Sequence, residues 1–182
     1  MSTMTITEGL AEIKTIQKRI EKKRDFILAN VVRQDRIKDP LEKQGGSEAV
    51  LERELQSIRD LWERLVKIRA AINRANLENN ILIEGQTRAV GDWISWKREV
   101  APNAANLWSQ MTTHIQNAKT QVAQKGLRSV ASAADVQSPD DVIVAVDILK
   151  LAQAREQVEN VQGILDGALS LKNATILIQI AD

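Results

Sequence analysis

The chain has 182 residues, a net charge of +1 at pH 7, a single histidine (His114) and no cysteine. These totals exclude disulfides, thiolate metal sites and a cysteine nucleophile, and they argue against a chain-wide electrostatic nucleic-acid binder. With no tyrosine, one phenylalanine and four tryptophans, no aromatic platform for single-stranded nucleic acid is expected.

The first predicted element is an amphipathic helix over residues 6–31. Thr5 or Thr7 can cap it, and Thr5 has Glu8 three residues later, which is the spacing of a capping box. A narrow apolar stripe with a seven-residue step runs along this helix, close to a coiled-coil seam: Ile6, Ile13, Ile20 and Ile27.

A second helix is predicted after the break made by Pro40 and the pair Gly45-Gly46, with Ser47 as its cap. Its stripe keeps the seven-residue step: Leu51, Ile58, Leu65 and Ile72. Two striped helices joined by a loop predict an antiparallel helical hairpin, in which each stripe buries the other.

A minor β element is predicted where the second helix ends in an asparagine-rich turn, because asparagine tolerates left-handed backbone. Residues 81–83, "ILI", are apolar with two β-branched isoleucines, and Gly85 ends the segment. A lone strand needs a partner for its backbone groups, and the alternating segment 174–180 is the best match in the chain. We therefore expect 81–84 to pair with 174–180, or either segment to pair with a neighbouring subunit.

Further helices follow in the pattern of the remaining residues. Thr87 is expected to start a third helix that Pro102 ends, and a fourth helix runs over 104–123 with Gly126 closing it. The sequence "SPDD" at 138–141 predicts the start of a last helix that reaches Leu171, although "DVIVAV" is also strand-like. The fold class is thus mainly α, with residues 1–100 and 101–182 forming one continuous domain.

Chemistry-bearing motifs are sparse. Neither GxGxxG nor GxxxxGK[ST] occurs, and the acids Asp140, Asp141 and Asp147 lack the spacing of an EF-hand. His114 has no orienting partner in the pattern, and the charged run 17–25 is typical of a solvated helix face. We therefore expect no enzyme activity, no cofactor and no metal.

Targeting signals are also missing from the pattern. No run of about 18 apolar residues exists, so no membrane span is expected. The first residues lack a basic region followed by an apolar core, so no secretion signal is expected either.

Two sets of apolar residues are the interface candidates. The tryptophans are interpreted either as core aromatics between helices or as anchors of a protein–protein interface, where tryptophan is favoured. The isoleucines of the C-terminal segment alternate in the manner of a strand that can join subunits. The candidates are Trp62, Trp93, Trp96, Trp108, Ile176, Ile178 and Ile180.

Residues 6–100 carry a resemblance to a known family. The residues that carry it are "QKRI" at 17–20, "INRAN" at 72–76, the strand-like segment after it and "TRAVGDWISWKREV" at 87–100. In these features the chain resembles the small septicolysin-like helical family of bacteria and phages, and that family name implies a cytolysin. As a whole, the cysteine-free helical body with an extending tail resembles bacteriophage virion components, such as head-associated or tail-associated structural proteins.

The pattern therefore favours a structural or assembly protein that associates with itself or with other proteins of a larger assembly, located in a virion or in the bacterial cytoplasm. The alternative that the family resemblance implies is a membrane-active protein. That alternative needs an amphipathic segment with a basic polar face, and residues 6–31 are the candidate.

Overall fold

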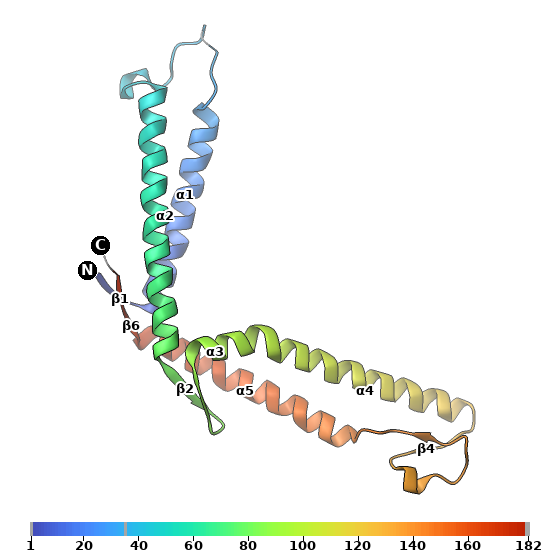
Figure 1. Cartoon of the computed structure of the whole chain (residues 1–182). Helices are drawn as coiled ribbons and strands as arrows, with labels where there is room; N and C mark the ends of the chain where they lie inside the picture. Colours follow the sequence, from blue (N-terminus) through green and yellow to red (C-terminus); the bar gives the residue numbers. More distant parts are fainter. Residues whose placement is uncertain (1, 35, 181–182) are drawn as a thin grey trace. The chain divides into compact units, whose positions relative to one another are not determined.

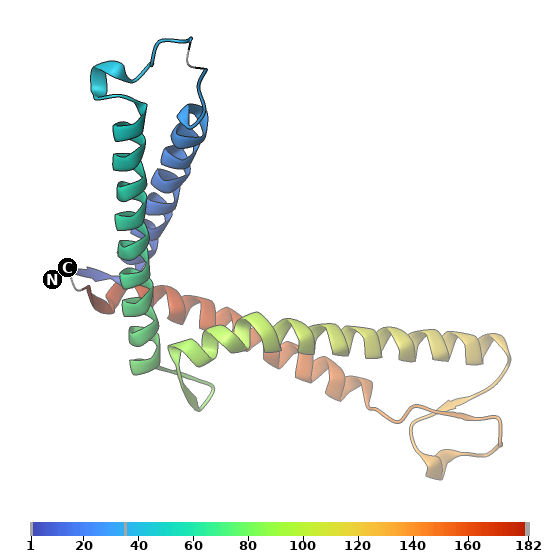
Figure 2. The ribbon, with the colours of Figure 1, turned by 45° about the horizontal axis from the view of Figure 1, so that its top comes forward.

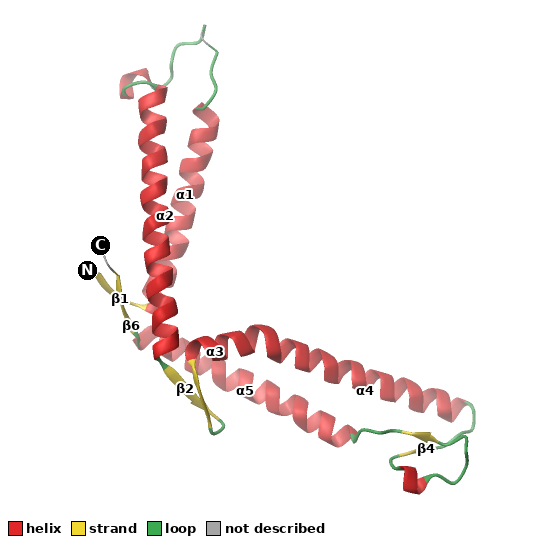
Figure 3. Cartoon of the chain, viewed as in Figure 1, coloured by secondary structure: helices red, strands yellow, loops and turns green. Residues whose placement is uncertain are grey.

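The computed structural model describes residues 2–34 and 36–180, and these residues form a mainly α-helical fold with a few short strands (Figure 3). This confirms the predicted fold class. The chain divides into two units, one made of residues 1–79 and 170–182 and the other of residues 80–169. Helical structure runs uninterrupted from Val90 to Gln124, through residue 100.

The first unit is built on the predicted antiparallel hairpin of α1 (Ile6–Asn30) and α2 (Ser47–Glu78), which lie side by side in Figures 1 and 2. The capping box is confirmed. The Thr5 hydroxyl accepts a hydrogen bond from the Glu8 amide at 3.2 Å, and the Glu8 carboxylate accepts one from the Thr5 amide at 2.7 Å. Each bond satisfies an amide that the helix itself leaves without an acceptor.

The core of this unit is formed by the apolar stripes of the two helices together with the last strand. Its buried members are Ile6, Ile13 and Ile16 of α1, Ile68, Ile72 and Ala75 of α2, and Ile178 and Ile180. Gly9 of α1 lets the C-terminal segment approach closely, because a Cβ at this position would lie 3.1 Å from Cδ1 of Ile178. The seven-residue step therefore predicted the buried face of α1 correctly.

Ser47 does not cap α2. Gly46 occupies that position, and Ser47 is the first helical residue. The Ser47 amide and hydroxyl both donate to the carboxylate of Asp39, with the amide at 2.7 Å. The acid from the preceding loop therefore supplies the capping acceptor that the sequence suggested Ser47 would supply. A short 3₁₀ turn, η1 (Glu42–Gln44), lies in the same loop.

The predicted strand pairing is wrong. Strand β2 (Asn80–Ile83) pairs antiparallel with β3 (Gln86–Ala89), and β6 (Leu177–Ile180) pairs antiparallel with β1 (Ser2–Thr5). Glu84 and Gly85 between β2 and β3 both have positive φ, at 46° and 79°, which is the requirement of a tight two-residue hairpin. This local turn gives β2 a partner at once, and the C-terminal segment pairs with the N-terminus of its own chain instead.

In the second unit, α3 (Val90–Ser95), the π-helical turn η2 (Trp96–Val100) and α4 (Ala101–Gln124) follow one another without a break. The predictions that Thr87 starts a helix and that Pro102 ends it are both wrong. Thr87 lies in β3, and the helix passes Pro102 because the wider π turn just before it relieves the clash that proline makes with the preceding turn. Gly126, with φ of 69°, closes α4 as predicted.

The last helix, α5 (Ile148–Thr175), begins later than predicted. The Asp141 carboxylate accepts the amides of Gln137 and Ser138, at 2.8 and 3.1 Å, so "SPDD" forms a turn. A 3₁₀ turn, η3 (Ala133–Asp135), precedes it, and the strand-like residues form β5 (Val142–Ile143), parallel to β4 (Ser129–Val130). α5 supplies Val161 and Leu165 to the second unit's core, whose other buried members are Ile81, Ile83, Val90 and Trp93.

No helix within residues 2–34 and 36–180 is long and apolar enough to cross a membrane. This agrees with the expectation from the sequence.

Candidate interaction surface on the hairpin

Three of the seven candidate interface residues belong to the cores rather than to the surface. Trp93 is 2% exposed, and its indole N–H donates to the Ile81 carbonyl at 3.1 Å. The Trp96 ring meets Trp93 edge-on at 5.7 Å between centroids, and the Arg88 guanidinium lies 4.9 Å from the Trp93 ring. These contacts make Trp93 the centre of the second unit's core, with Trp96 partly buried against it.

Ile178 and Ile180 are buried in the first unit's core, and Ile176 packs against that core. The Ile176 carbonyl also accepts the Ile6 amide at 3.2 Å, next to the β1–β6 ladder. The C-terminal segment is thus anchored within its own chain. It is not available to join subunits without leaving this core.

Trp62 is the candidate that remains on the surface. Its side chain is 54% exposed on α2 and lines a groove of about 460 Å³ between α1 and α2. Ile20 and Leu65 give the groove an apolar lining and are themselves packed against the first unit's core. The remaining lining residues are Gln17, Glu21, Arg24 and Arg69. Trp108 is half-buried on α4.

Trp62 is part of an exposed apolar stripe on α2. Leu55 (43% exposed) and Val66 (64% exposed) precede and follow it by seven and four residues, so the three side chains share one side of the helix. We call these three residues the Trp62 stripe. Leu55 therefore lies on the exposed side of α2 and not with the buried Ile58 and Ile72. The sequence did hold a signal for this exposed stripe. α2 has more apolar positions than the single buried face of a helix in a two-helix hairpin can hold.

Two ion pairs between the helices hold the walls of the hairpin in place. Lys23 contacts Glu54 at 2.6 Å, and Arg64 contacts Glu12 at 2.9 Å, with all four side chains about 30% exposed. Arg64 also donates to the Ser2 hydroxyl at 3.2 Å, which ties β1 to the same network. These partly buried contacts fix the spacing of α1 and α2 on which the groove depends.

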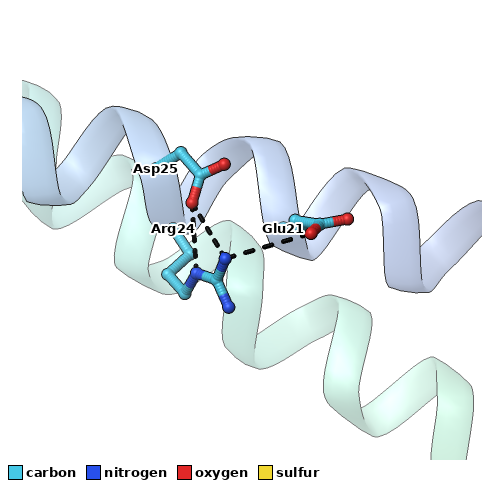
Figure 4. A network of polar contacts seen from close by, with 3 residues as sticks. All are labelled: Glu21, Arg24 and Asp25. Carbon is cyan, nitrogen blue, oxygen red and sulfur yellow. Dashed lines mark hydrogen bonds and ion pairs between the residues drawn. The ribbon is translucent and has the colours of Figure 1, made fainter.

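The rim of the groove carries charges of both signs. Figure 4 shows Arg24 beside Asp25 and Glu21, with its guanidinium 3.0 Å and 4.0 Å from their carboxylates. All three side chains are more than half exposed, so these pairs add little to stability. They nevertheless leave an acid and a base side by side at the edge of an apolar groove.

A second apolar surface lies at the loop end of the hairpin, far along α1 and α2 from the β1–β6 ribbon (Figure 1). Three cations, Arg33, Arg36 and Lys38, are interspersed with aliphatic side chains there. We call the aliphatic residues the tip patch; each is more than half exposed: Leu28, Val31, Val32 and Ile37.

His114 and possible metal-binding side chains were the other candidates for chemistry. His114 lines a separate, mostly apolar groove of about 420 Å³ in the second unit, beside Met111 and Ile115. No cluster of three or more His, Cys, Asp or Glu side chains suited to hold a metal ion is found in the part of the chain that the structure describes.

Comparison with known proteins identifies a similar fold but no function. No protein-family model matches the chain, and no curated protein matches it. It is similar to the crystal structure of a functionally unknown conserved protein from Corynebacterium diphtheriae, with a TM-score of 0.58 and 14% sequence identity over 98% of this chain and 100% of that one. At this identity the likeness shows a shared fold alone.

Proposed function

We propose that this chain is a non-enzymatic structural or assembly protein that associates with copies of itself or docks on a larger particle. The observation that carries the proposal is the exposed area. The structure exposes 12,694 Å² for a mass of 20.3 kDa.

The chain forms two units, so the matching reference is two compact domains. Two independent compact domains of half the mass would together expose about 10,600 Å², which leaves a surplus of about 2,000 Å². A specific protein–protein interface of ordinary size covers about 800 Å² on each partner, and obligate interfaces cover more. The surplus is therefore sufficient for one obligate interface or two ordinary ones.

The exposed area includes large apolar side chains on both units, among them Trp62, Val66, Leu82 and Leu107. Single exposed aliphatic residues are normal, but an aromatic residue within an apolar stripe is typical of an interface. A place in a bacteriophage virion, as a head- or tail-associated component, is the finer form of the proposal. It is supported by the overall resemblance to such components, and the expected location is then the virion or the bacterial cytoplasm.

The test is the solution mass of the full-length chain by size-exclusion chromatography with light scattering, over a wide range of concentration. We expect a discrete oligomer whose population rises with concentration. A monomer at every concentration would refute self-association. Truncation before residue 174 is not a suitable variant, because it removes Ile178 and Ile180 from the first unit's core.

A second function, membrane activity, is favoured by one observation, the tip patch. The segment expected to act on membranes, residues 6–31, is mostly unsuitable, because Ile6, Ile13 and Ile16 on its apolar face are buried in the first unit. In the sequence of the hairpin loop, the cations Arg33 and Arg36 accompany the tip patch, and cations beside exposed aliphatic side chains are the two signals that bind a protein to an anionic lipid surface. Lys38 is instead paired with Glu42 at 2.9 Å.

Vesicles test this second function. If it holds, the chain sediments with phosphatidylserine vesicles and not with phosphatidylcholine vesicles, and the double variant Val32→Asp, Ile37→Asp stays in solution. Absence of the wild-type chain from the phosphatidylserine pellet would remove the membrane function.

A further inference from the structure

We infer that the Trp62 stripe and the adjoining groove are the surface through which two copies of this chain associate, with the stripe of each copy seated in the groove of the other. The inference rests on the proposed function and names its contact. The partner is a second copy of the chain, related by a two-fold axis.

Trp62 has the properties of an interface anchor. Tryptophan and arginine are enriched among the residues that carry the binding energy of protein interfaces, and Trp62 lines the groove together with Arg24 and Arg69. Because Trp62 is 54% exposed, roughly 100 Å² of its surface remains to be covered. The apolar groove walls from Ile20 and Leu65 offer an indole ring a matching site.

The two signs of charge at the rim favour a second copy as the occupant. A two-fold contact places each surface against itself, so a surface with one sign of charge would repel its own copy. The groove is instead lined by the acid Glu21 and the bases Arg24 and Arg69. Rotation about the axis can bring Glu21 of one copy to Arg69 of the other.

The exposed area of the chain and the rigidity of the α1–α2 hairpin both favour a second copy as the partner. The surplus of about 2,000 Å² is summed over both units, and half of it would still exceed the roughly 800 Å² that one partner contributes to an interface of ordinary size. The Lys23–Glu54 and Arg64–Glu12 pairs already fix the two helices that form the groove. Little conformational freedom is therefore left to be lost on association.

The experiment is sedimentation equilibrium of the full-length chain and two variants, Trp62→Glu and Leu82→Glu. Leu82 is the matched control, because it is 67% exposed on β2, outside the stripe and the groove. We expect the wild type and Leu82→Glu to form the same dimer. Because a two-fold contact contains Trp62 twice, the Kd of Trp62→Glu should rise about 1,000-fold. Far-UV circular dichroism of all three proteins should coincide.

Charge exchange supplies an independent readout. Glu21→Arg places like charges together and should weaken the dimer at least about tenfold, and addition of Arg69→Glu should restore it. Failure of the second substitution to restore the dimer would refute the two-fold contact.

The outcomes separate the inference from the proposed function. A wild-type dimer that Trp62→Glu leaves intact would overturn the inference while self-association stands. Equal dissociation by Trp62→Glu and Leu82→Glu would overturn it as well. A wild-type chain that stays monomeric at every concentration would refute both the inference and self-association.

Discussion

Replacement of Trp93 by phenylalanine tests the account of the second unit's core. The change removes the indole N–H that donates to the Ile81 carbonyl at 3.1 Å in a buried site, and a lost partner in such a site costs about 1–3 kcal/mol. The smaller ring leaves a void and loses part of the edge-on contact with Trp96, which adds about 1 kcal/mol. We expect the free energy of unfolding to fall by about 2–4 kcal/mol.

The assay is urea denaturation followed by far-UV circular dichroism, with Trp62→Phe as the matched control. Trp62 makes no hydrogen bond through its indole N–H to another described residue and is half exposed, so the control should change the free energy of unfolding by less than about 0.5 kcal/mol. Both measurements are made at a concentration where the wild type is monomeric. A loss below about 1 kcal/mol for Trp93→Phe, or equal losses for both variants, would refute the assignment of Trp93 to the core.

Three further predictions concern local structure. The pKa of Asp39 is lowered from 3.8 to about 2, because its carboxylate accepts hydrogen bonds from the hydroxyl and the amide of Ser47. The ionised carboxylate therefore stabilises the folded state above pH 3.8, and this stabilisation is lost as the pH falls to about 2. The difference in unfolding free energy between wild type and Asp39→Asn should shrink over that interval, and a difference independent of pH would contradict this. Gly163→Ala should raise the thermal midpoint and add about 1 kcal/mol, because a Cβ there meets no atom within 4 Å; a lower midpoint would show that this face is covered. Thr5→Ala should cost about 1 kcal/mol in urea denaturation while Thr5→Ser costs less, and equal losses would show that the hydroxyl does not cap α1.

Local signals in the sequence predicted the features that depend on neighbouring residues. Thr5 and Glu8 are three residues apart and form their capping box whatever the rest of the chain does. The seven-residue step of isoleucines likewise identified the buried face of α1, because that periodicity follows from helix geometry alone. Gly126 ended α4 for a similar reason, since its positive φ suits glycine.

Strand pairing and helix boundaries were less predictable because competing local interactions decide them. The apolar composition of 81–84 and the alternation in 174–180 identified strands, but neither signal determines which strand is the partner. Glu84 and Gly85 turn the chain tightly enough for β3 to pair with β2 first. Likewise the Asp141 carboxylate accepts two backbone amides of its own turn. Ser138 and Pro139, which suggested the start of a helix, therefore lie in a turn.

The candidate surface could be predicted only in part. Trp62 and Trp93 are the same residue type on helices with similar apolar spacing, so the sequence could not tell which of them is covered. The β2–β3 hairpin and residues 161–169 of α5 decide this, since both cover Trp93 and both belong to the unit 80–169, whereas Trp62 belongs to the other unit. Ile178 and Ile180 were candidates for a subunit contact, and pairing with Ser2–Thr5 places them in the core instead.

The most direct test of the central claim is the solution mass of the full-length chain measured beside that of Trp62→Glu. The account predicts a dimer for the wild type and a monomer of unchanged circular dichroism for the variant. A wild type and a variant of the same mass at every concentration would contradict it.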